Sequence, residues 1–322
     1  MPYNLRMTKT NLLTVVIPTY NRLTLLKQSI SSLENQTIKG FRVLILDNNS
    51  NDGTVDYLKN LKSSSFEIEL VFRNQNIGYF QNLLDGINLV RTKYISFLSD
   101  DNEYLPNCLE RLLLAINENN DTRVVIGSHN LMTFDRIIKM RASKRNNAKY
   151  GRKSKLSPYL KNKKARELQL QKKIICIDSA MFLTDQLRSA ALIEKHGLDF
   201  TLFSQYLLLG GAARYISDPI MNYRENPEGI SQNSNSQVSF ANYVIESCNE
   251  LIRNNRFSNL EITWIKNEIF RYQYILMKHD LIKPRILVRN FKFNSNLNSY
   301  KLMMRLPIIL SRKFLHKSYI LR

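Results

Sequence analysis

Several features of cross-linked, membrane-spanning or secreted proteins are missing from this sequence. Its 322 residues include three cysteines, Cys108, Cys176 and Cys248, which are odd in number, far apart and without a Cys-x-x-Cys spacing. This pattern excludes a disulfide framework and a structural zinc site. No run of about 18 apolar residues predicts a membrane span, and no charged-then-apolar leader with a small-residue cleavage site is found. We therefore expect a cytoplasmic protein.

Acidic residues are also scarce, and unevenly so. The chain has 47 Lys and Arg against 27 Asp and Glu, a formal net charge of +20. Residues 136–173 contain 15 Lys or Arg and one acid, Glu167, while residues 281–322 contain ten Lys or Arg and no acid, which leaves −4 for the rest. The two basic segments suit an anionic partner. Neither has the signature of a nucleic-acid-reading module, so we expect no specific nucleic acid as partner.

What is present is the pattern of an α/β protein. The chain is 43% hydrophobic and long enough for one large domain with an appendage. Apolar, β-branched runs predict strands at residues 12–17, 41–46, 68–72, 94–98 and 123–126. Helical patterns lie between them: one to residue 33 with Asn21 as its N-cap, one to about 61, and others near 79–91 and 105–118. This alternation indicates a mostly parallel sheet covered on both faces.

The pattern changes after residue 133. Residues 133–173 predict a flexible basic loop with one helical piece near 161–172. We then expect a strand at 174–177 and helices near 185–195 and 202–209. From about residue 238 to the end the sequence is helical, with breaks at 254–258 and 283–284.

Polar clusters follow three of the predicted strands, at residues 18–22, 47–53 and 99–102. Ligands of such sheets bind at the carboxyl ends of the strands. Any one cluster could simply form a turn or cap a helix, but three at one sheet edge favour a site. Asp100 and Asp101 repel each other unless a cation lies between them and a phosphate, and the oxygen ligands favour Mg or Mn.

These clusters resemble the motifs of family 2 glycosyltransferases of the GT-A fold. The matching segments are VVIPTYNR (15–22), LDNNSNDGT (46–54), NIG (76–78) with Asn82, and FLSDDN (97–102). The resemblance is strong over residues 10–130 and weak over 174–235. It implies a catalytic domain at 1–235, with a nucleotide-binding part at about 10–130, a basic insertion at 133–173 and an acceptor part at 174–235. The remaining 238–322 would be a basic helical region.

The resemblance also implies roles for individual residues. Asp47 would meet the base of a nucleotide-sugar, Asp100 would lie near the ribose and the metal, and Asp101 would be the metal ligand. The nucleotide pocket would be lined by Pro18, Thr19, Tyr20, Asn21, Asn49, Asp52, Asn76, Gly78 and Asn82. The family is inverting, so one in-line displacement with one general base is implied.

The expected general base is missing from its usual place. Many relatives have a Glu-Asp pair after a Gly-Phe-Asp-like turn, where this chain has Ser204 and Gln205. Asp199 is the nearest substitute and Asp178 a second candidate, although either could be structural. Glu225, in a segment resembling the family's mobile acceptor loop, could assist the metal or the acceptor. Gln81 replaces an Arg common in relatives, so donor preference could differ.

The resemblance thus implies a metal-dependent, inverting hexosyltransferase. Its donor would be a nucleotide-sugar, UDP-linked, and its acceptor a hydroxyl of a bacterial surface polysaccharide or its lipid-linked precursor. The alternative is a degenerate relative that binds nucleotide-sugar or anionic glycan without turnover. The acid-free carboxyl-terminal segment, whose residues 296–322 interleave apolar and basic side chains, suits a helix in the interface of an anionic membrane, or else one that packs on the catalytic domain. A peripheral location on the inner face of the cell membrane is expected.

Overall fold

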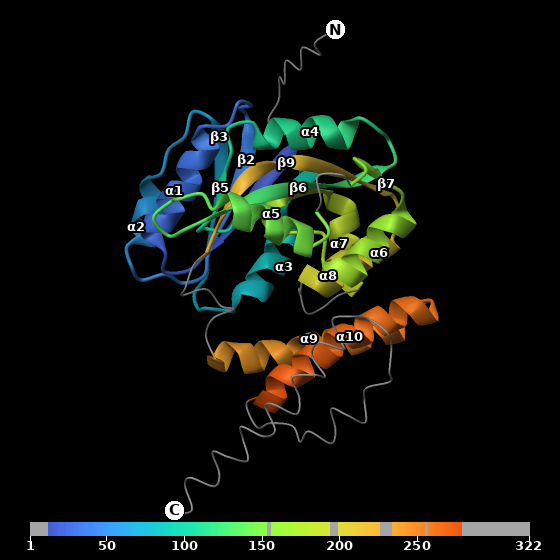
Figure 1. The fold of residues 1–322 in the computed structure, drawn as a ribbon. Helices are drawn as coiled ribbons and strands as arrows, with labels where there is room; N and C mark the ends of the chain where they lie inside the picture. Colours follow the sequence, from blue (N-terminus) through green and yellow to red (C-terminus); the bar gives the residue numbers. More distant parts are fainter. Residues whose placement is uncertain (1–11, 153–155, 194–198, 226–233, 255–256, 279–322) are drawn as a thin grey trace, which may run out of the picture. The chain divides into compact units, whose positions relative to one another are not determined.

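The computed structural model describes residues 12–152, 156–193, 199–225, 234–254 and 257–278. The chain divides into two compact units, residues 1–233 and 234–322. The first unit contains a twisted sheet between two layers of helices, and two helices are described in the second (Figure 1).

One sheet of nine strands runs through the described part of the first unit, in the order β3-β2-β1-β4-β8-β6-β9-β5, with β7 on β9. The first four strands of this order, β3, β2, β1 and β4, are parallel, and β6 and β9 are parallel to each other. The short β8 is antiparallel to β4 and β6 and joins the two groups. The strands are β1 (Leu13–Thr19), β2 (Phe41–Asp47), β3 (Phe66–Phe72), β4 (Tyr94–Phe97), β5 (Glu103–Tyr104), β6 (Thr122–Met132), β7 (Tyr159–Leu160), β8 (Ala180–Leu183) and β9 (Ala212–Arg224).

Alternation along the strands creates two cores. Helices cover the sheet in two groups, one on each face. Val15 and Ile17 of β1 lie in the core between the sheet and the first group, whereas Val16 lies in the core on the other face, with the second group. Gly86 allows the close approach on the second face, since a Cβ there would lie 2.5 Å from the Leu46 side chain. The first group comprises α1 (Leu23–Glu34), α2 (Thr54–Asn60) and α4 (Cys108–Asn117); the second comprises α3 (Tyr79–Leu89), α6 (Asn162–Lys172), α7 (Thr184–Ile193) and α8 (Asp199–Leu208).

Strand register brings the predicted motifs together. Thr19 pairs with Asp47 at the carboxyl ends of β1 and β2, and Val16 pairs with Phe97 at the end of β4. The loop that carries Asp100 and Asp101 therefore begins beside the end of β1. The sequence-based expectation of a mostly parallel sheet is confirmed, and the polar clusters lie at one edge of it.

Three expectations for local structure were wrong. Residues 174–177 do not form a strand; Ile177–Ser179 is a 3-10 turn, and the strand is β8, further along. Residues 133–173 contain a helix that was not expected, α5 (Met140–Lys149), which buries only Ser143 and Asn147 and so lacks an apolar stripe. Asn21 is not the N-cap of α1: the cap is Arg22, while Asn21 has φ of 51° and accepts a hydrogen bond from the Asn51 amide.

The long strand β9 was not expected either. It pairs with β6 along most of its length, but the register shifts near Gly127 and Ser128. At this irregularity β9 contains Asp218 and Pro219, which interrupt the alternation that identifies a strand in sequence. The end of β9 at Arg224 is important for the candidate site.

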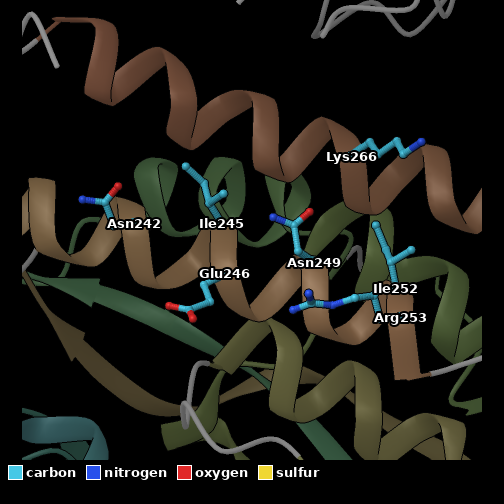
Figure 2. A pocket seen from close by; sticks show the side chains of 7 residues that line it. All are labelled: Asn242, Ile245, Glu246, Asn249, Ile252, Arg253 and Lys266. Atoms are coloured by element: carbon cyan, nitrogen blue, oxygen red, sulfur yellow. The ribbon is translucent and has the colours of Figure 1, made fainter. Parts of the chain in front are cut away.

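The described part of the second unit contains α9 (Ser234–Asn254) and α10 (Asn259–Lys278). The rings of Phe240 and Tyr272 meet at 5.6 Å between the two helices. A pocket on this unit is lined by side chains of α9 and by Lys266 of α10 (Figure 2). None of its residues belongs to a predicted motif. The predicted membrane-interface segment at 296–322 lies outside the described residues. Among the described helices, none combines the length and apolar composition needed to span a bilayer.

Candidate active site

The two acids of the 99–102 loop share a cationic partner. Nη1 of Arg22 lies 3.0 Å from Oδ1 of Asp100 and 3.0 Å from Oδ2 of Asp101. The Thr19 hydroxyl donates a 2.8 Å hydrogen bond to the other oxygen of Asp100. Residues from β1, its following loop and the loop after β4 thus converge on one point.

Burial gives Asp100 unusual acid–base behaviour. It is 4% exposed, and loss of solvation raises its pKa to about 6, an effect that Arg22 opposes and Asp101 reinforces. A carboxylate in this position is stabilised by any additional cation. Its geometry and charge therefore suit a cation site.

Asp47 has one satisfied and one unsatisfied oxygen. It is 1% exposed, and its Oδ2 accepts a 3.1 Å hydrogen bond from the Ser50 amide. Within the described part of the chain, no hydrogen-bond partner reaches the buried Oδ1. Such an unpaired buried acceptor is costly unless a ligand donates to it.

Asparagines join the loops beside Asp47. The Asn48 side chain donates to Oδ1 of Asn76 at 2.8 Å and accepts from the Ile77 amide at 3.0 Å. Asn49 adopts a left-handed conformation with φ of 71°, and Gly78 has φ of 84°. These contacts bring the 47–53 and 76–78 segments together, as their shared place at the sheet edge predicts.

Asp52 accepts hydrogen bonds at the beginnings of two helices, so its carboxylate is engaged within the protein. Its Oδ2 accepts from the Leu23 amide at 2.9 Å, and its Oδ1 accepts from the Thr54 hydroxyl at 2.6 Å. It therefore fixes the beginnings of α1 and α2. Pro18 lies within β1 beside Leu46, and Tyr20 is 43% exposed at the rim of this edge.

Asn82 supports the end of β2 from α3. Its side chain donates to the Leu46 carbonyl at 3.0 Å and accepts from Nε of Arg73 at 3.1 Å. Arg73 also pairs with Asp85 at 2.9 Å. Arg73 was not singled out in the sequence, although it directly follows β3 at the same sheet edge.

A second group of residues fixes the position of the 99–102 loop, which we call the acidic loop. Asp178 is 3% exposed; its Oδ1 accepts from the Ser99 amide at 2.6 Å and its Oδ2 from the Asn102 side chain at 3.0 Å. The Arg224 amide donates to Oδ1 of Asn102 at 2.8 Å. The Asn102 side chain is therefore held at both of its polar atoms, with Asp178 bonded to its nitrogen and the Arg224 amide bonded to its oxygen.

Arg224 has further contacts with this loop. Its Nε donates to the Asp101 carbonyl at 2.8 Å, and its Nη2 lies 2.7 Å from Oε1 of Glu103. Its side chain is 1% exposed. The sequence did not single out Arg224, although it directly precedes the candidate Glu225.

The three candidates for the base differ in environment. Both oxygens of Asp178 are engaged with the 99–102 loop, which favours a positioning role. Glu225 is exposed and pairs with Lys139 at 2.6 Å. Asp199 begins α8, and its side chain lies outside the described residues. Ser204 and Gln205, where an acid pair was expected, are both 3% exposed within α8. The choice among the three remains a prediction.

The sequence matches a known protein family. The sequence model described as "Glycosyl transferase family 2" matches residues 14–187, just over half of the chain. The chain belongs to glycosyl transferase family 2. This confirms the resemblance seen in the motifs.

Curated relatives match about a third of this chain. It is 35% identical over 108 residues to a "GalNAc(5)-diNAcBac-PP-undecaprenol beta-1,3-glucosyltransferase" of Campylobacter jejuni, a match that covers 33% of this chain and 35% of the relative. It is 33% identical over 112 residues to an uncharacterized glycosyltransferase of Methanocaldococcus jannaschii, covering 34% and 39%. The matches therefore span little more than a third of these relatives.

Solved structures confirm the fold over a longer stretch. S. aureus TarS 1-349, in complex with UDP-GlcNAc, has a TM-score of 0.61 at 14% identity and covers 83% of this chain and 73% of the other. The mannosyltransferase PcManGT of Pyrobaculum calidifontis, in complex with GDP-Man and Mn²⁺, has a TM-score of 0.55 at 14% identity, covering 93% and 81%. The glycosyltransferase thus has the GT-A fold, an α/β sheet structure with a helical carboxyl-terminal region.

Proposed function

We propose that this glycosyltransferase transfers a sugar from a nucleotide-sugar, UDP-linked, to a hydroxyl of a bacterial surface glycan or its lipid-linked precursor, with inversion at the anomeric carbon. The observation that carries the proposal is the cluster at the ends of β1, β2 and β4. There the buried Asp47 has an unsatisfied acceptor, and Asp100 and Asp101 share one cation. Asp47 can accept a hydrogen bond from an N–H of a nucleotide base, and the pair of Asp100 and Asp101 can bind a cation that accompanies a diphosphate.

The acidic pair is compatible with a divalent cation. Asp100 and Asp101 point an oxygen each to the same guanidinium nitrogen of Arg22, so a cation position between them already exists. No group of three or more Asp, Glu, His or Cys able to hold a metal occurs among the described residues. Mg²⁺ or Mn²⁺ suits this set, since such ions are often held by one or two carboxylates with substrate phosphates and water. When bound, the ion neutralises charge on the leaving diphosphate.

The chain's own residues then hold the donor. Asp47 accepts from the base, the asparagine-linked loops at 47–53 and 76–78 border the nucleoside, and Thr19 orients Asp100 toward the ribose side. Asp101 faces the diphosphate together with Arg22. The acceptor hydroxyl gives its proton to a carboxylate, for which Asp199 is the first choice, before Glu225 and Asp178.

The acceptor is proposed from the relatives and from charge. The Campylobacter relative is named for an undecaprenol-linked substrate, and the basic segments of this chain suit an anionic membrane beside such a substrate. This supports a peripheral location at the cytoplasmic face of the membrane. The alternative, a relative that binds nucleotide-sugar without turnover, is favoured by Ser204 and Gln205 at the place of the acid pair.

Donor binding and turnover can be tested separately. Thermal unfolding would be followed with UDP, GDP and CDP, each with and without Mn²⁺. We expect the largest stabilisation with UDP and Mn²⁺ together. Slow Mn²⁺-dependent release of UDP from one UDP-sugar would support an enzyme. Binding without release under any acceptor would support the alternative, and no stabilisation by any nucleotide would refute both.

A further inference from the structure

An exposed apolar and basic surface lies next to the acidic loop, where β6 leads into α5. Its apolar members Phe134, Ile137 and Met140 are 54%, 64% and 60% exposed, three of the five most exposed large hydrophobic side chains in the described part of the chain. Its basic members are Arg141, Lys144 and Arg145 on α5, all exposed. We call these six residues the basic-apolar patch.

The apolar side chains of the patch are not packed in the hydrophobic core. α5 is attached to β6 through polar contacts: the Ser143 hydroxyl accepts from the Leu131 amide at 2.7 Å, and the Asn147 side chain donates to the His129 carbonyl at 2.7 Å. The helix buries only Ser143 and Asn147. Ile137 and Met140 are therefore available to an external apolar phase.

Its cations are likewise available to an external partner. Arg141, Lys144 and Arg145 have no ion-pair partner among the residues that the structure describes. Residues 134–150 hold six Lys or Arg and a single acid, Asp135. Exposed apolar side chains beside unpaired cations are typical of a surface that enters the headgroup region of an anionic bilayer.

The segment that carries the patch is linked to the candidate site by side-chain contacts. The guanidinium of Arg224 donates to the Asp101 carbonyl at 2.8 Å and to the Phe134 carbonyl at 2.7 Å. Lys139 and Glu225 make a second link, at 2.6 Å. A membrane at the patch would therefore lie beside the loop that carries Asp101.

We propose that the basic-apolar patch is the membrane-docking surface of this glycosyltransferase, and that its occupant is an anionic phospholipid surface. Ile137 and Met140 enter the interface, while Arg141, Lys144 and Arg145 contact lipid phosphates. This inference rests on the proposed lipid-linked acceptor, which docking would place at the acidic loop. It locates membrane contact in residues 134–145, whereas the sequence pointed first to residues 296–322.

The test is sedimentation of the full chain with vesicles of phosphatidylcholine alone or mixed with phosphatidylglycerol. We expect binding to the mixed vesicles only. R141Q/K144Q/R145Q should weaken partitioning roughly 100-fold, from about 1 kcal/mol for each basic residue. I137S/M140S should weaken it roughly 10-fold or more. Phe134 is left unchanged because its ring faces Arg224.

Two matched controls remove similar groups elsewhere. K161Q/K163Q/K172Q removes three exposed charges from α6 and its N-cap, and L192S/L260S replaces two side chains that are 71% and 58% exposed. Both should retain vesicle binding to within a few-fold. An equal loss in the α6 variant would show attraction by net charge alone and overturn the proposal.

Other outcomes identify a different occupant. Unchanged vesicle binding in both patch variants would overturn the proposal and leave membrane contact to another segment. If the protein binds polyphosphate as tightly as vesicles, and I137S/M140S does not change that binding, the occupant would be a soluble anionic glycan. A lower melting temperature of I137S/M140S, with vesicle binding intact, would show that the patch packs within the chain. UDP-dependent thermal stabilisation is measured in every variant: its absence refutes the proposed function, whereas its presence without vesicle binding refutes only the docking surface.

Discussion

Asp178→Asn separates a positioning role from a catalytic one. Asp178 accepts two hydrogen bonds, from the Ser99 amide at 2.6 Å and from the Asn102 side chain at 3.0 Å, and is 3% exposed. Asparagine has the same shape but only one acceptor oxygen. Its amide group would therefore face one of the two donors.

The magnitude follows from these contacts. A hydrogen bond to a buried charged group contributes about 1.5–3 kcal/mol, and an unsatisfied buried donor costs a further 1–3 kcal/mol. We expect Asp178→Asn to lower the free energy of unfolding by about 3 kcal/mol and to weaken Mn²⁺-dependent UDP binding, because the 99–102 loop loses its fixed position. Asp185→Asn is the matched control, since that side chain is 91% exposed. It should change the free energy of unfolding by less than about 0.5 kcal/mol.

Denaturant unfolding and UDP titration together distinguish a positioning role of Asp178 from a catalytic one. If Asp178 acts only as the general base and does not position the loop, Asp178→Asn should keep wild-type stability and UDP affinity while transfer falls by about 10²–10⁴-fold. That combination would refute the positioning role. Loss of stability and of UDP affinity together would support it, and would leave Asp199 and Glu225 as candidates for the base.

Four further predictions concern other parts of the site and fold. Asp101→Ala should abolish transfer and most Mn²⁺-dependent UDP binding, and normal turnover would disprove the metal assignment. Asp47→Ala should weaken UDP binding about tenfold or more without altering metal preference; an unchanged UDP dissociation constant would reduce this residue to a turn former. Asp199→Asn should reduce transfer at least 100-fold with donor binding intact, whereas full activity in that variant and none in Glu225→Gln would reverse the order of candidates. Burial and the nearby Arg152 lower the pKa of His129 to about 3, so the unfolded state gains a proton below about pH 6.5 that the folded state does not. Stability should then fall by about 2 kcal/mol between pH 7 and pH 5, and His129→Gln should remove that part of the slope in thermal unfolding measured at both pH values.

The sequence was informative where the physics is local. The runs at β1, β2 and β4 are apolar and β-branched, and parallel pairing places their following residues at one edge. Thr19, Asp47 and Asp100 could therefore be placed together from the sequence. The assignment of Asn21 as a helix cap failed because its side chain bonds to the neighbouring loop instead.

Other features depend on distant partners. α5 escaped notice because its buried face consists of Ser143 and Asn147, and polar contacts leave no hydrophobic period to detect. β9 escaped because the irregularity at Pro219 interrupts its alternation. Arg224 reads in the sequence as an ordinary basic residue, since its partners on α1 and the 99–102 loop lie more than a hundred positions away.

The acidic loop takes its geometry from the second half of the domain. The motifs all lie within residues 10–130, and the curated matches cover about that length. Yet Asp178, beside β8, and Arg224, at the end of β9, hold Ser99, Asp101 and Asn102 in place. A chain with the motifs but without these two supports would keep its acids and lose their common orientation toward Arg22, since two adjacent carboxylates otherwise repel each other. Variation in residues 174–225 should therefore alter donor and cation binding as well as the choice of acceptor.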